Sequence, residues 1–212
     1  MPRRLDLGEE HLRLEKMKEY EHGYPDDCLI CGVDEAGRGP LAGPVSAGAV
    51  ILPRDAEILY LNDSKKLSEK RREELYDRIR ECAIAWNVAV ADHVTIDRIN
   101  ILQADYQAMR DAVEGLSIKP QVLFNDAVII PGLDMEQVKL IHGDALSVSI
   151  AAASIMAKVT RDRLMYQYDE IYPEYGFARN KGYGTAEHIA AIKKYGPCPI
   201  HRMTFIRKFI DA

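Results

Sequence analysis

The chain has 212 residues and 47% hydrophobic side chains, enough to build the core of one domain. Its apolar runs fall short of the ~20 residues that cross a bilayer, and the N-terminus lacks the apolar core of a signal peptide, so we expect a cytoplasmic protein. A net charge of −5 argues against a nonspecific polyanion binder, but it is compatible with a nuclease whose metal-binding acids supply part of that charge.

The first half of the chain predicts a helix, two strands, a second helix and a third strand, in that order. Gly23 and Pro25 end the first helix, and Ser68 is an N-cap for the second. The predicted elements are a helix over 8–21, strands over 28–34 and 44–52, a helix over 68–83 and a strand over 85–91.

The second half alternates helices and strands. The predicted elements are a helix over 97–115, a strand over 121–124, a strand over 137–141, and helices over 146–171 and 185–194. Strands in series followed by alternation predict an α/β fold with a mixed sheet flanked by helices. Since no linker divides the chain, we expect an N-terminal helical segment (1–27), a core (28–174) and a C-terminal helical cap of the same domain (175–212).

Two adjacent acids, Asp34 and Glu35, follow an apolar strand and precede the tripeptide Gly37-Arg38-Gly39. Neighbouring carboxylates repel each other, so their burial together is unfavourable without a cation. A hard divalent ion such as Mg²⁺ takes oxygen ligands and leaves room for substrate phosphates, and glycines let a phosphate or a sugar approach the main chain. The segment therefore predicts metal-dependent chemistry on nucleic acid.

Two more acids, Asp126 and Asp144, follow apolar strands further along the chain. Side chains at strand ends are rigidly held and exposed, so they are candidates for the same metal centre. Each has a purely structural alternative: Asp144 as a helix N-cap and Asp126 as a turn residue after Asn125. Four acids suffice for two ions that activate a water and stabilise a leaving oxygen.

The cysteines permit a different metal site. Cys28 and Cys31, with Cys198 and His201, have the ligand types of a Cys₃His zinc centre. An offset of three on a predicted strand places Cys28 and Cys31 on opposite faces. We therefore favour small buried or edge residues in a reducing compartment.

The segment around Asp34 resembles the opening motif of the ribonuclease HII family, which nicks DNA at embedded ribonucleotides. Further stretches match in the family's order, from about Cys28 to Phe205: Asn62-Asp-Ser-Lys-Lys-Leu67, His142-Gly-Asp144, Ala151 to Asp162, Asn180-Lys-Gly-Tyr-Gly-Thr185 and His201-Arg-Met-Thr-Phe205. Each motif alone is weak evidence for the family, but the complete set in this order is specific. The family usually has an apolar residue where Asn125 stands, which puts the local strand register in question.

The resemblance implies a ribonuclease H-like fold and a residue-by-residue assignment of the site. It implies metal-binding and catalytic roles for Asp34, Glu35, Asp126 and Asp144, with Mg²⁺ or Mn²⁺ as cofactor and two ions when substrate is bound. It implies substrate contacts for Gly37, Arg38, Gly39, Lys65 and Tyr183, of which Tyr183 would stack on a sugar beside the 2′-hydroxyl. Two basic residues of the long helix, Lys158 and Arg163, are further candidates for contacts to the DNA backbone.

The implied activity is hydrolysis 5′ of ribonucleotides embedded in duplex DNA and in RNA–DNA hybrids, leaving 3′-hydroxyl and 5′-phosphate ends. The implied roles are ribonucleotide excision repair and RNA primer removal. We expect a monomer without a membrane partner. A sliding-clamp-binding tail, which some family members carry, is not evident after Phe205.

Other interpretations are a dinucleotide-binding enzyme, another ribonuclease H-like nuclease, or a non-catalytic nucleic-acid binder. Gly37-x-Gly39-x-x-Ala42 formally matches a dinucleotide fingerprint, but Pro40 and Pro44 do not suit its helix, and the acid pair would repel pyrophosphate. A junction resolvase or a ribonuclease HIII shares the metal chemistry but not the pairing of the two glycine-rich motifs. We expect a ribonuclease HIII to carry an additional N-terminal domain. Four converging acids would be unfavourable in a protein that only binds nucleic acid.

Overall fold

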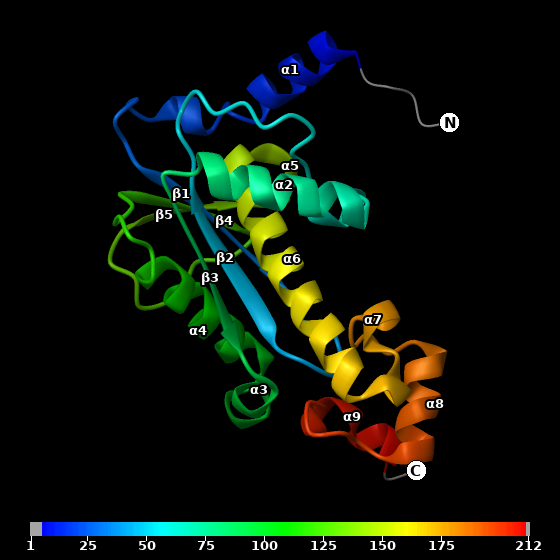
Figure 1. Cartoon of the computed structure of the whole chain (residues 1–212). Helices are drawn as coiled ribbons and strands as arrows, with labels where there is room; N and C mark the ends of the chain where they lie inside the picture. Colours follow the sequence, from blue (N-terminus) through cyan, green and yellow to red (C-terminus); the bar gives the residue numbers. More distant parts are fainter. Residues whose placement is uncertain (1–5, 211–212) are drawn as a thin grey trace.

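A mixed five-stranded sheet organises the chain, in a computed structural model that describes residues 6–210 (Figure 1). The strand order is β3-β2-β1-β4-β5; β2 is antiparallel to both of its neighbours, whereas β1, β4 and β5 are parallel. The bounds are β1 Ile30–Ala36, β2 Val45–Ile51, β3 Ala85–Ala91, β4 Val122–Asp126 and β5 Glu136–Leu140. Three parallel strands thus bring their carboxyl ends to one edge of the sheet.

The long helix α6, Val148–Ile171, packs directly on β1 and β2 (yellow in Figure 1). A Cβ atom at Gly32 would lie 2.0 Å from the carbonyl carbon of Ser149, and one at Gly48 would lie 2.4 Å from the carbonyl oxygen of Ala153. Only glycine permits so close an approach of helix and strand. This packing places the first half of α6 beside the strand that carries the acid pair.

Helices cover both faces of the sheet, as the sequence predicted. Helix α2, Glu69–Cys82, packs against α6 on one face, and α4, Ile101–Glu114, packs over β2 and β3 on the other (Figure 1). The other elements are α1 Leu7–Lys16, η1 Glu21–Gly23, η2 Ser64–Lys66, α3 His93–Ile99, α5 Gly143–Leu146, η3 Pro173–Tyr175, α7 Phe177–Asn180, α8 Ala186–Tyr195 and α9 Met203–Ile210.

The segment after α6 folds back as a group of short helices at the far end of that helix (Figure 1). Helices α7, α8 and α9 surround a separate apolar cluster that includes Phe177, Ile192 and Ile206. We call residues 175–210 the cap. No helix among residues 6–210 is both long enough and apolar enough to cross a membrane.

Most predicted elements are confirmed, and the errors occur where polar residues divide helices. The strand over 85–91 and the Ser68 N-cap are confirmed, and the Ser68 hydroxyl accepts a hydrogen bond from Arg71 N. The single helix over 97–115 is wrong, because Asn100 adopts φ +66° and its side chain caps a new helix at Leu102 and Gln103.

The other boundary errors have similar causes. The helix over 146–171 is confirmed as α6, which begins two residues later than predicted because Ser147 adopts an extended conformation and caps it; Leu146 is the last residue of α5. The first helix ends at Lys16 rather than at 21, and α9 was not predicted. Residues 1–5 and 211–212 lie outside the described residues. The first of these ranges holds the start of the expected N-terminal helical segment and of the terminus expected to lack a signal-peptide core, and the second holds the end of the expected cap.

Candidate active site

Three parallel strands deliver the predicted carboxylates to one edge of the sheet. Asp34 and Glu35 lie on β1, Asp126 is the last residue of β4, and Asp144 lies in the first turn of α5, which follows β5. Val33 pairs with Asn125 across the parallel ladder, which sets Asp34 beside Asp126. The acid pair lies within β1 rather than beyond its end, because Glu35 and Ala36 still pair with β2.

Asp34 is the most deeply placed of these acids, with 4% of its surface exposed. Burial raises the pKa of Asp34 well above its usual value, and the nearby Glu35 and Asp126 charges raise it further. The Glu35 amide and the Ser154 hydroxyl hydrogen-bond to the Asp34 carboxylate and act in the opposite direction. Burial, and then the Asp126 charge, likewise raise the pKa of Glu35 against the opposing effect of Arg38.

Asp126 and Asp144 are linked through the start of α5. The Asp126 carboxylate accepts a hydrogen bond of 2.7 Å from Gly143 N. Burial raises the pKa of Asp144, and Asp63 and Asp126 add to the effect. Asp63 lies close enough to Asp144 to raise its pKa and is a fifth acid at this edge, which the sequence showed only within the motif over 62–67.

Both structural alternatives for these acids are wrong. Asp144 is not a helix N-cap, because His142 holds that position for α5 and Ser147 caps α6. Asp126 is not a turn residue, because it pairs with Leu140 at the end of β4. The Asn125 register is regular: its buried side chain donates a 2.8 Å hydrogen bond to Gln137, while its side-chain oxygen has no hydrogen-bond partner among the described residues.

Lys65 is the cation directed at the acidic cluster. It follows Asp63, whose side chain caps the short η2 turn through Lys65 N at 2.9 Å. Burial opposes the charge of Lys65, but Asp34, Asp144, Asp63 and Glu35 together raise its pKa. A lysine placed in this way can contact a phosphate that lies over the carboxylates.

Arg38 lies between two carboxylates. Its guanidinium is 3.7 Å from Glu35 and 3.5 Å from Asp105, which projects from α4. Asp105 is fully buried, and neither of its oxygens has a hydrogen bond among the described residues. Burial and then the Glu35 charge raise the pKa of Asp105 to about 8, against the attraction of Arg38.

We expect Asp105→Asn to change the pH dependence of stability. A carboxyl whose folded-state pKa is about 8 and whose reference value is 3.8 makes the folded protein lose stability as pH rises between those values. The asparagine variant lacks this loss, which amounts to about 1.4 kcal/mol per pH unit, so its free energy of unfolding should gain up to about 4 kcal/mol on wild type between pH 5 and pH 8. Urea denaturation of both proteins at the two pH values measures it; a difference independent of pH would contradict the assignment.

Two buried arginines hold the main chain of the segment between β1 and β2, which begins with Gly37-Arg38-Gly39. Arg202 donates to the carbonyl oxygens of Gly37 at 2.6 Å, Arg38 at 2.9 Å and Gly43 at 2.9 Å. Arg161 donates to the carbonyls of Pro44 at 2.9 Å, Ala42 at 3.2 Å and Lys181 at 3.0 Å. Both side chains are fully buried, so they fix this loop from behind and join it to the cap.

The outer side of the loop faces Tyr183. A Cβ atom at Gly39 would lie 3.6 Å from the Tyr183 ring, whose residue is 46% exposed. Gly37 faces inward instead: its φ is +100°, and a Cβ atom there would lie 2.1 Å from Arg161 Nε. The structure therefore assigns the two glycines different requirements, although the sequence suggested one reason for both.

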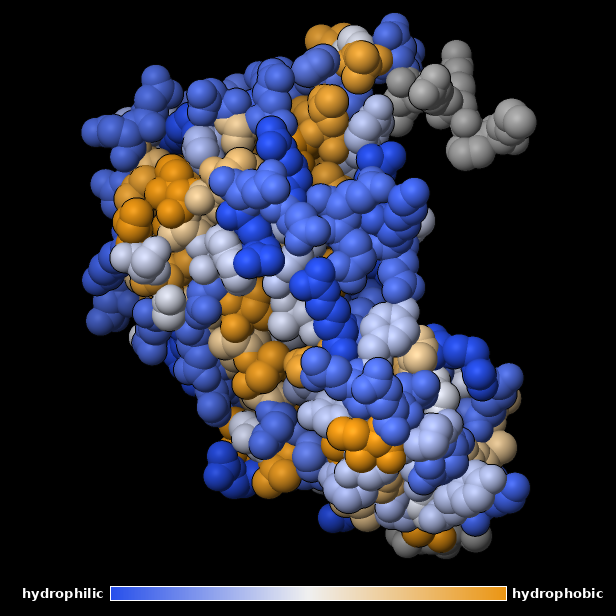
Figure 2. All heavy atoms as spheres, in the orientation of Figure 1, coloured by the Kyte–Doolittle hydropathy of each residue, from blue (hydrophilic) through white to orange (hydrophobic). Residues whose placement is uncertain are grey.

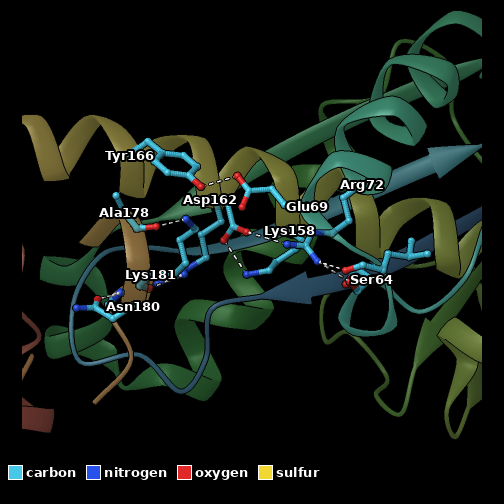
Figure 3. A network of polar contacts seen from close by, with 12 residues as sticks. Ser64, Glu69, Arg72, Lys158, Asp162, Tyr166, Ala178, Asn180 and Lys181 are labelled. Atoms are coloured by element: carbon cyan, nitrogen blue, oxygen red, sulfur yellow. Dashed lines mark hydrogen bonds and ion pairs between the residues drawn. The ribbon is translucent and has the colours of Figure 1, made fainter. Parts of the chain in front are cut away.

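The two helix cations predicted to contact DNA have partners within the protein. Figure 3 shows Lys158 and Arg72 beside Asp162, where they lie 2.7 Å and 3.8 Å from different oxygens of its carboxylate. Burial lowers the pKa of Lys158 despite this pairing. Arg163 pairs with Glu73 and lies over the Tyr76 ring at 4.4 Å. Substrate contact by either residue stays a prediction.

The network in Figure 3 lies along α6 where the surface is hollowed between α2 and the cap (Figures 1 and 2). Lys181 Nζ lies 3.6 Å from the centre of the Tyr166 ring, and the Tyr166 hydroxyl donates to Glu69. Hydrophilic side chains predominate on this part of the molecule (Figure 2). A polar, partly cationic concavity leads from α2 toward the cap.

The donor set fits hard divalent cations. Among residues 6–210, no group of three His, Cys, Asp or Glu side chains is arranged so that it could hold a metal ion by itself. Mg²⁺, however, needs only one or two carboxylates when water and substrate phosphates complete its coordination shell. The raised pKa values of Asp34 and Glu35 reflect burial and mutual repulsion that a cation would relieve.

The cysteines lie apart from this cluster. Cys28 precedes β1 rather than lying on it, whereas Cys31 is buried within the strand, so the argument from opposite strand faces is wrong for Cys28. Cys198 contacts His201 inside the cap at 3.1 Å. All four cysteines are free thiols.

The fold and the acidic strand ends define a nuclease of the ribonuclease H class. A family model described as Ribonuclease HII matches residues 31–208, and the chain belongs to the ribonuclease HII family. It is therefore a ribonuclease H, a hydrolase that cleaves nucleic acid. This result excludes the dinucleotide-binding, junction-resolvase and ribonuclease HIII interpretations.

Close relatives and solved structures agree. The chain is 61% identical over 206 residues to a ribonuclease HII of Lachnoclostridium phytofermentans, covering 97% of this chain and 81% of the relative. It is 57% identical over 191 residues to that of Acetivibrio thermocellus, covering 90% and 73%. The crystal structure of ribonuclease H2 from Pyrococcus horikoshii superposes with a TM-score of 0.71 at 29% identity, covering 86% of this chain and 97% of that one. A PCNA:RNase HII complex from Archaeoglobus fulgidus gives 0.71 at 26%, covering 86% and 95%.

Proposed function

We propose that this ribonuclease cleaves on the 5′ side of ribonucleotides embedded in duplex DNA and in RNA–DNA hybrids, leaving 3′-hydroxyl and 5′-phosphate ends. The observation that carries the proposal is the joint placement of two features at one edge of the sheet. Acids from three parallel strand ends lie beside a glycine loop whose outer residue, Gly39, faces the exposed ring of Tyr183.

Asp34, Glu35, Asp126 and Asp144 would hold two divalent ions, Mg²⁺ or Mn²⁺. Such ions activate a water and stabilise the leaving oxygen of a phosphodiester. The chain's own residues orient this centre: Gly143 N and the Ser154 hydroxyl hydrogen-bond to the carboxylates of Asp126 and Asp34. Lys65, held beside the acids, would contact a substrate phosphate.

The Gly37-Arg38-Gly39 loop and Tyr183 would select the ribose. A 2′-hydroxyl both donates and accepts hydrogen bonds, and DNA lacks it. Main-chain groups can read it only where no side chain intervenes, as at Gly39. Arg38 would support the loop from its position between Glu35 and Asp105. Lys158, which lies in the network of Figure 3, and Arg163, which pairs with Glu73, would add contacts to the DNA backbone.

The proposal extends to the protein's setting. We propose that the chain acts as a monomer, with residues 28–174 as catalytic core and 175–212 as a cap of the same domain. The activity would serve ribonucleotide excision repair and the removal of RNA primers. Size-exclusion chromatography with light scattering, with and without a duplex, tests the oligomeric state.

We expect strict dependence on a divalent metal and on the 2′-hydroxyl. The test compares three duplexes of one sequence: all DNA, DNA with one ribonucleotide, and an RNA–DNA hybrid, each with Mg²⁺, with Mn²⁺ and with excess chelator. Cleavage is expected at the ribonucleotide and in the hybrid with either metal, because both ions are hard and suit carboxylates. End mapping should place the cut 5′ of the ribonucleotide.

Three outcomes would contradict the proposal in different ways. Full activity in chelator would remove the metal centre. Equal cleavage of the all-DNA duplex would remove the role of the 2′-hydroxyl. A strong preference for the hybrid over the single ribonucleotide would assign a different specificity.

A further inference from the structure

A chain of hydrogen bonds runs through the interior of the cap and ends at Tyr183. Cys198 N donates to His201 Nδ1 at 2.9 Å, and His201 Nε2 lies 3.0 Å from His188 Nε2. His188 Nδ1 lies 2.9 Å from the carbonyl oxygen of Tyr183. Both histidines are buried, with 0% and 1% of their surfaces exposed, so water does not replace these bonds.

The partners of the two rings fix their protons. The Tyr183 carbonyl can only accept, so His188 Nδ1 carries a hydrogen and, in a neutral ring, His188 Nε2 accepts. His201 Nδ1 lies 2.9 Å from Cys198 N, 3.1 Å from Cys198 Sγ and 3.2 Å from the Cys198 carbonyl oxygen. The shortest of these contacts is to the Cys198 N–H, which can only donate, so we assign His201 Nδ1 as acceptor and His201 Nε2 as donor to His188. Every link is satisfied when both rings are neutral. Burial lowers the pKa of both histidines, that of His201 to about 4 with a contribution from His188.

Aromatic side chains hold the two imidazoles in this arrangement. The Tyr175 ring lies 4.9 Å from the His201 ring, and the Phe177 ring lies 5.3 Å from the His188 ring. These rings belong to the apolar cluster of the cap. Because the packed imidazoles cannot rotate, the histidine pair fixes the Tyr183 main chain relative to Cys198 and α8.

The same segment holds the opposite wall of the proposed ribose site. Arg202, next to His201, donates to the carbonyls of Gly37 and Arg38. The main chains of the two walls also meet, because Leu41 N donates to Gly182 O at 2.7 Å. Two adjacent residues thus reach both sides of the gap between Gly39 and Tyr183, one directly and one through His188.

We propose that His188 and His201 are positioning residues that set the Tyr183 main chain opposite the Gly37-Arg38-Gly39 loop, and with it the spacing across which a ribose is recognised. The inference rests on the proposed function, in which Tyr183 contacts the sugar. The Tyr183 carbonyl also accepts from Thr185 N at 2.8 Å, so loss of the histidine bond leaves the local turn formed but less constrained.

The test uses His188→Leu, which keeps an apolar side chain of moderate size and removes both hydrogen bonds, and His188→Asn, whose amide can still donate to the Tyr183 carbonyl. On the single-ribonucleotide duplex we expect His188→Leu to lose about 10-fold or more in kcat, since small misplacements near the reacting groups are costly. KM should change less than about twofold, because phosphate contacts supply most of the affinity. His188→Asn should recover most of the lost kcat.

The double variant of His188→Leu with Tyr183→Ala separates positioning from a general loosening of the cap. If His188 acts through Tyr183, the double variant should turn over no more slowly than Tyr183→Ala alone. Ile192→Ala is the matched control, because Ile192 is a buried residue of α8 outside the hydrogen-bond chain. It should lower the melting temperature while leaving kcat near wild type.

Each result decides between the proposals. Wild-type kcat in folded His188→Leu, or additive losses in the double variant, would overturn the positioning role. If circular dichroism shows His188→Leu unfolded, His201→Asn decides instead, because its side-chain oxygen can still accept from Cys198 N while the link to His188 is lost; unchanged kcat would then overturn the role. Wild-type kcat in Tyr183→Ala would refute the proposed sugar contact itself.

Discussion

Asp34→Asn is expected to lose nearly all turnover on the single-ribonucleotide duplex while the protein stays folded. The amide keeps the shape of the side chain but loses the charge that would hold a cation. Changes in residues that merely orient a metal ligand cost roughly 10–100-fold, so the loss of a ligand charge should exceed about 100-fold. Glu35→Gln and Asp144→Asn should behave in the same way. Initial rates at saturating Mg²⁺ measure the effect.

The stability of the metal-free variant provides the control for this experiment. Asp34 is buried beside the charges of Glu35 and Asp126, and its pKa is raised for that reason. An amide cannot ionise, so the substitution removes the cost of burying this carboxyl, and the melting temperature in chelator at pH 7 should be unchanged or higher. A fall in melting temperature would mean that lost activity reports misfolding. Near-normal activity would remove Asp34 from the proposed centre.

Gly37→Ala is expected to destabilise the fold as well as abolish cleavage. Gly37 has φ +100°, and the new Cβ would lie 2.1 Å from Arg161 Nε and 2.9 Å from the Pro44 carbonyl oxygen. A strained backbone of this kind costs about 1–3 kcal/mol, and displacement of Arg161 would break its carbonyl bonds in addition. For a chain of this size the melting temperature should fall by roughly 5–10 °C. Thermal denaturation followed by circular dichroism measures it.

Gly39→Ala is the matched control two residues away. Its Cβ would meet only the Tyr183 ring, at 3.6 Å, which is an ordinary contact. We expect a melting temperature within about 2–3 °C of wild type, corresponding to less than about 1 kcal/mol. Cleavage at a single ribonucleotide should still fall strongly, because the methyl group would occupy the gap facing Tyr183. Equal destabilisation by both alanines would refute the different requirements assigned to the two glycines.

The sequence located the acids because each adjoins an apolar strand, and strand ends are recognisable from local pattern. Asp34, Asp126 and Asp144 were found in this way, and the parallel pairing of their strands brings them together. Asp105 was not found, because it lies inside an amphipathic helix and reaches Arg38 only through packing of α4 on the sheet. Local periodicity carries no information about such a contact.

The arginines show a second limit of the sequence. Arg161 directly precedes Asp162 in the chain, but Asp162 contacts Lys158 and Arg72, while Arg161 binds carbonyls of distant segments. Every residue type has a main-chain carbonyl group, so no pattern of residue types in the sequence could have identified these acceptors. The division of the 97–115 helix is different, because Asn100 is a common capping residue and its signal was present.

The buried arginines have a consequence for how the molecule unfolds. Arg161 and Arg202 are fully buried, and among residues 6–210 neither has a carboxylate within ion-pair distance; carbonyl oxygens of the loop and the cap solvate them instead. Separating the cap from the sheet would take all three carbonyl acceptors from Arg202 and the Lys181 carbonyl from Arg161, which is costly for buried guanidinium ions. We therefore expect core and cap to melt in a single cooperative transition, so that proteolytic nicking near residue 176 would inactivate the enzyme by unfolding the ribose-selecting loop.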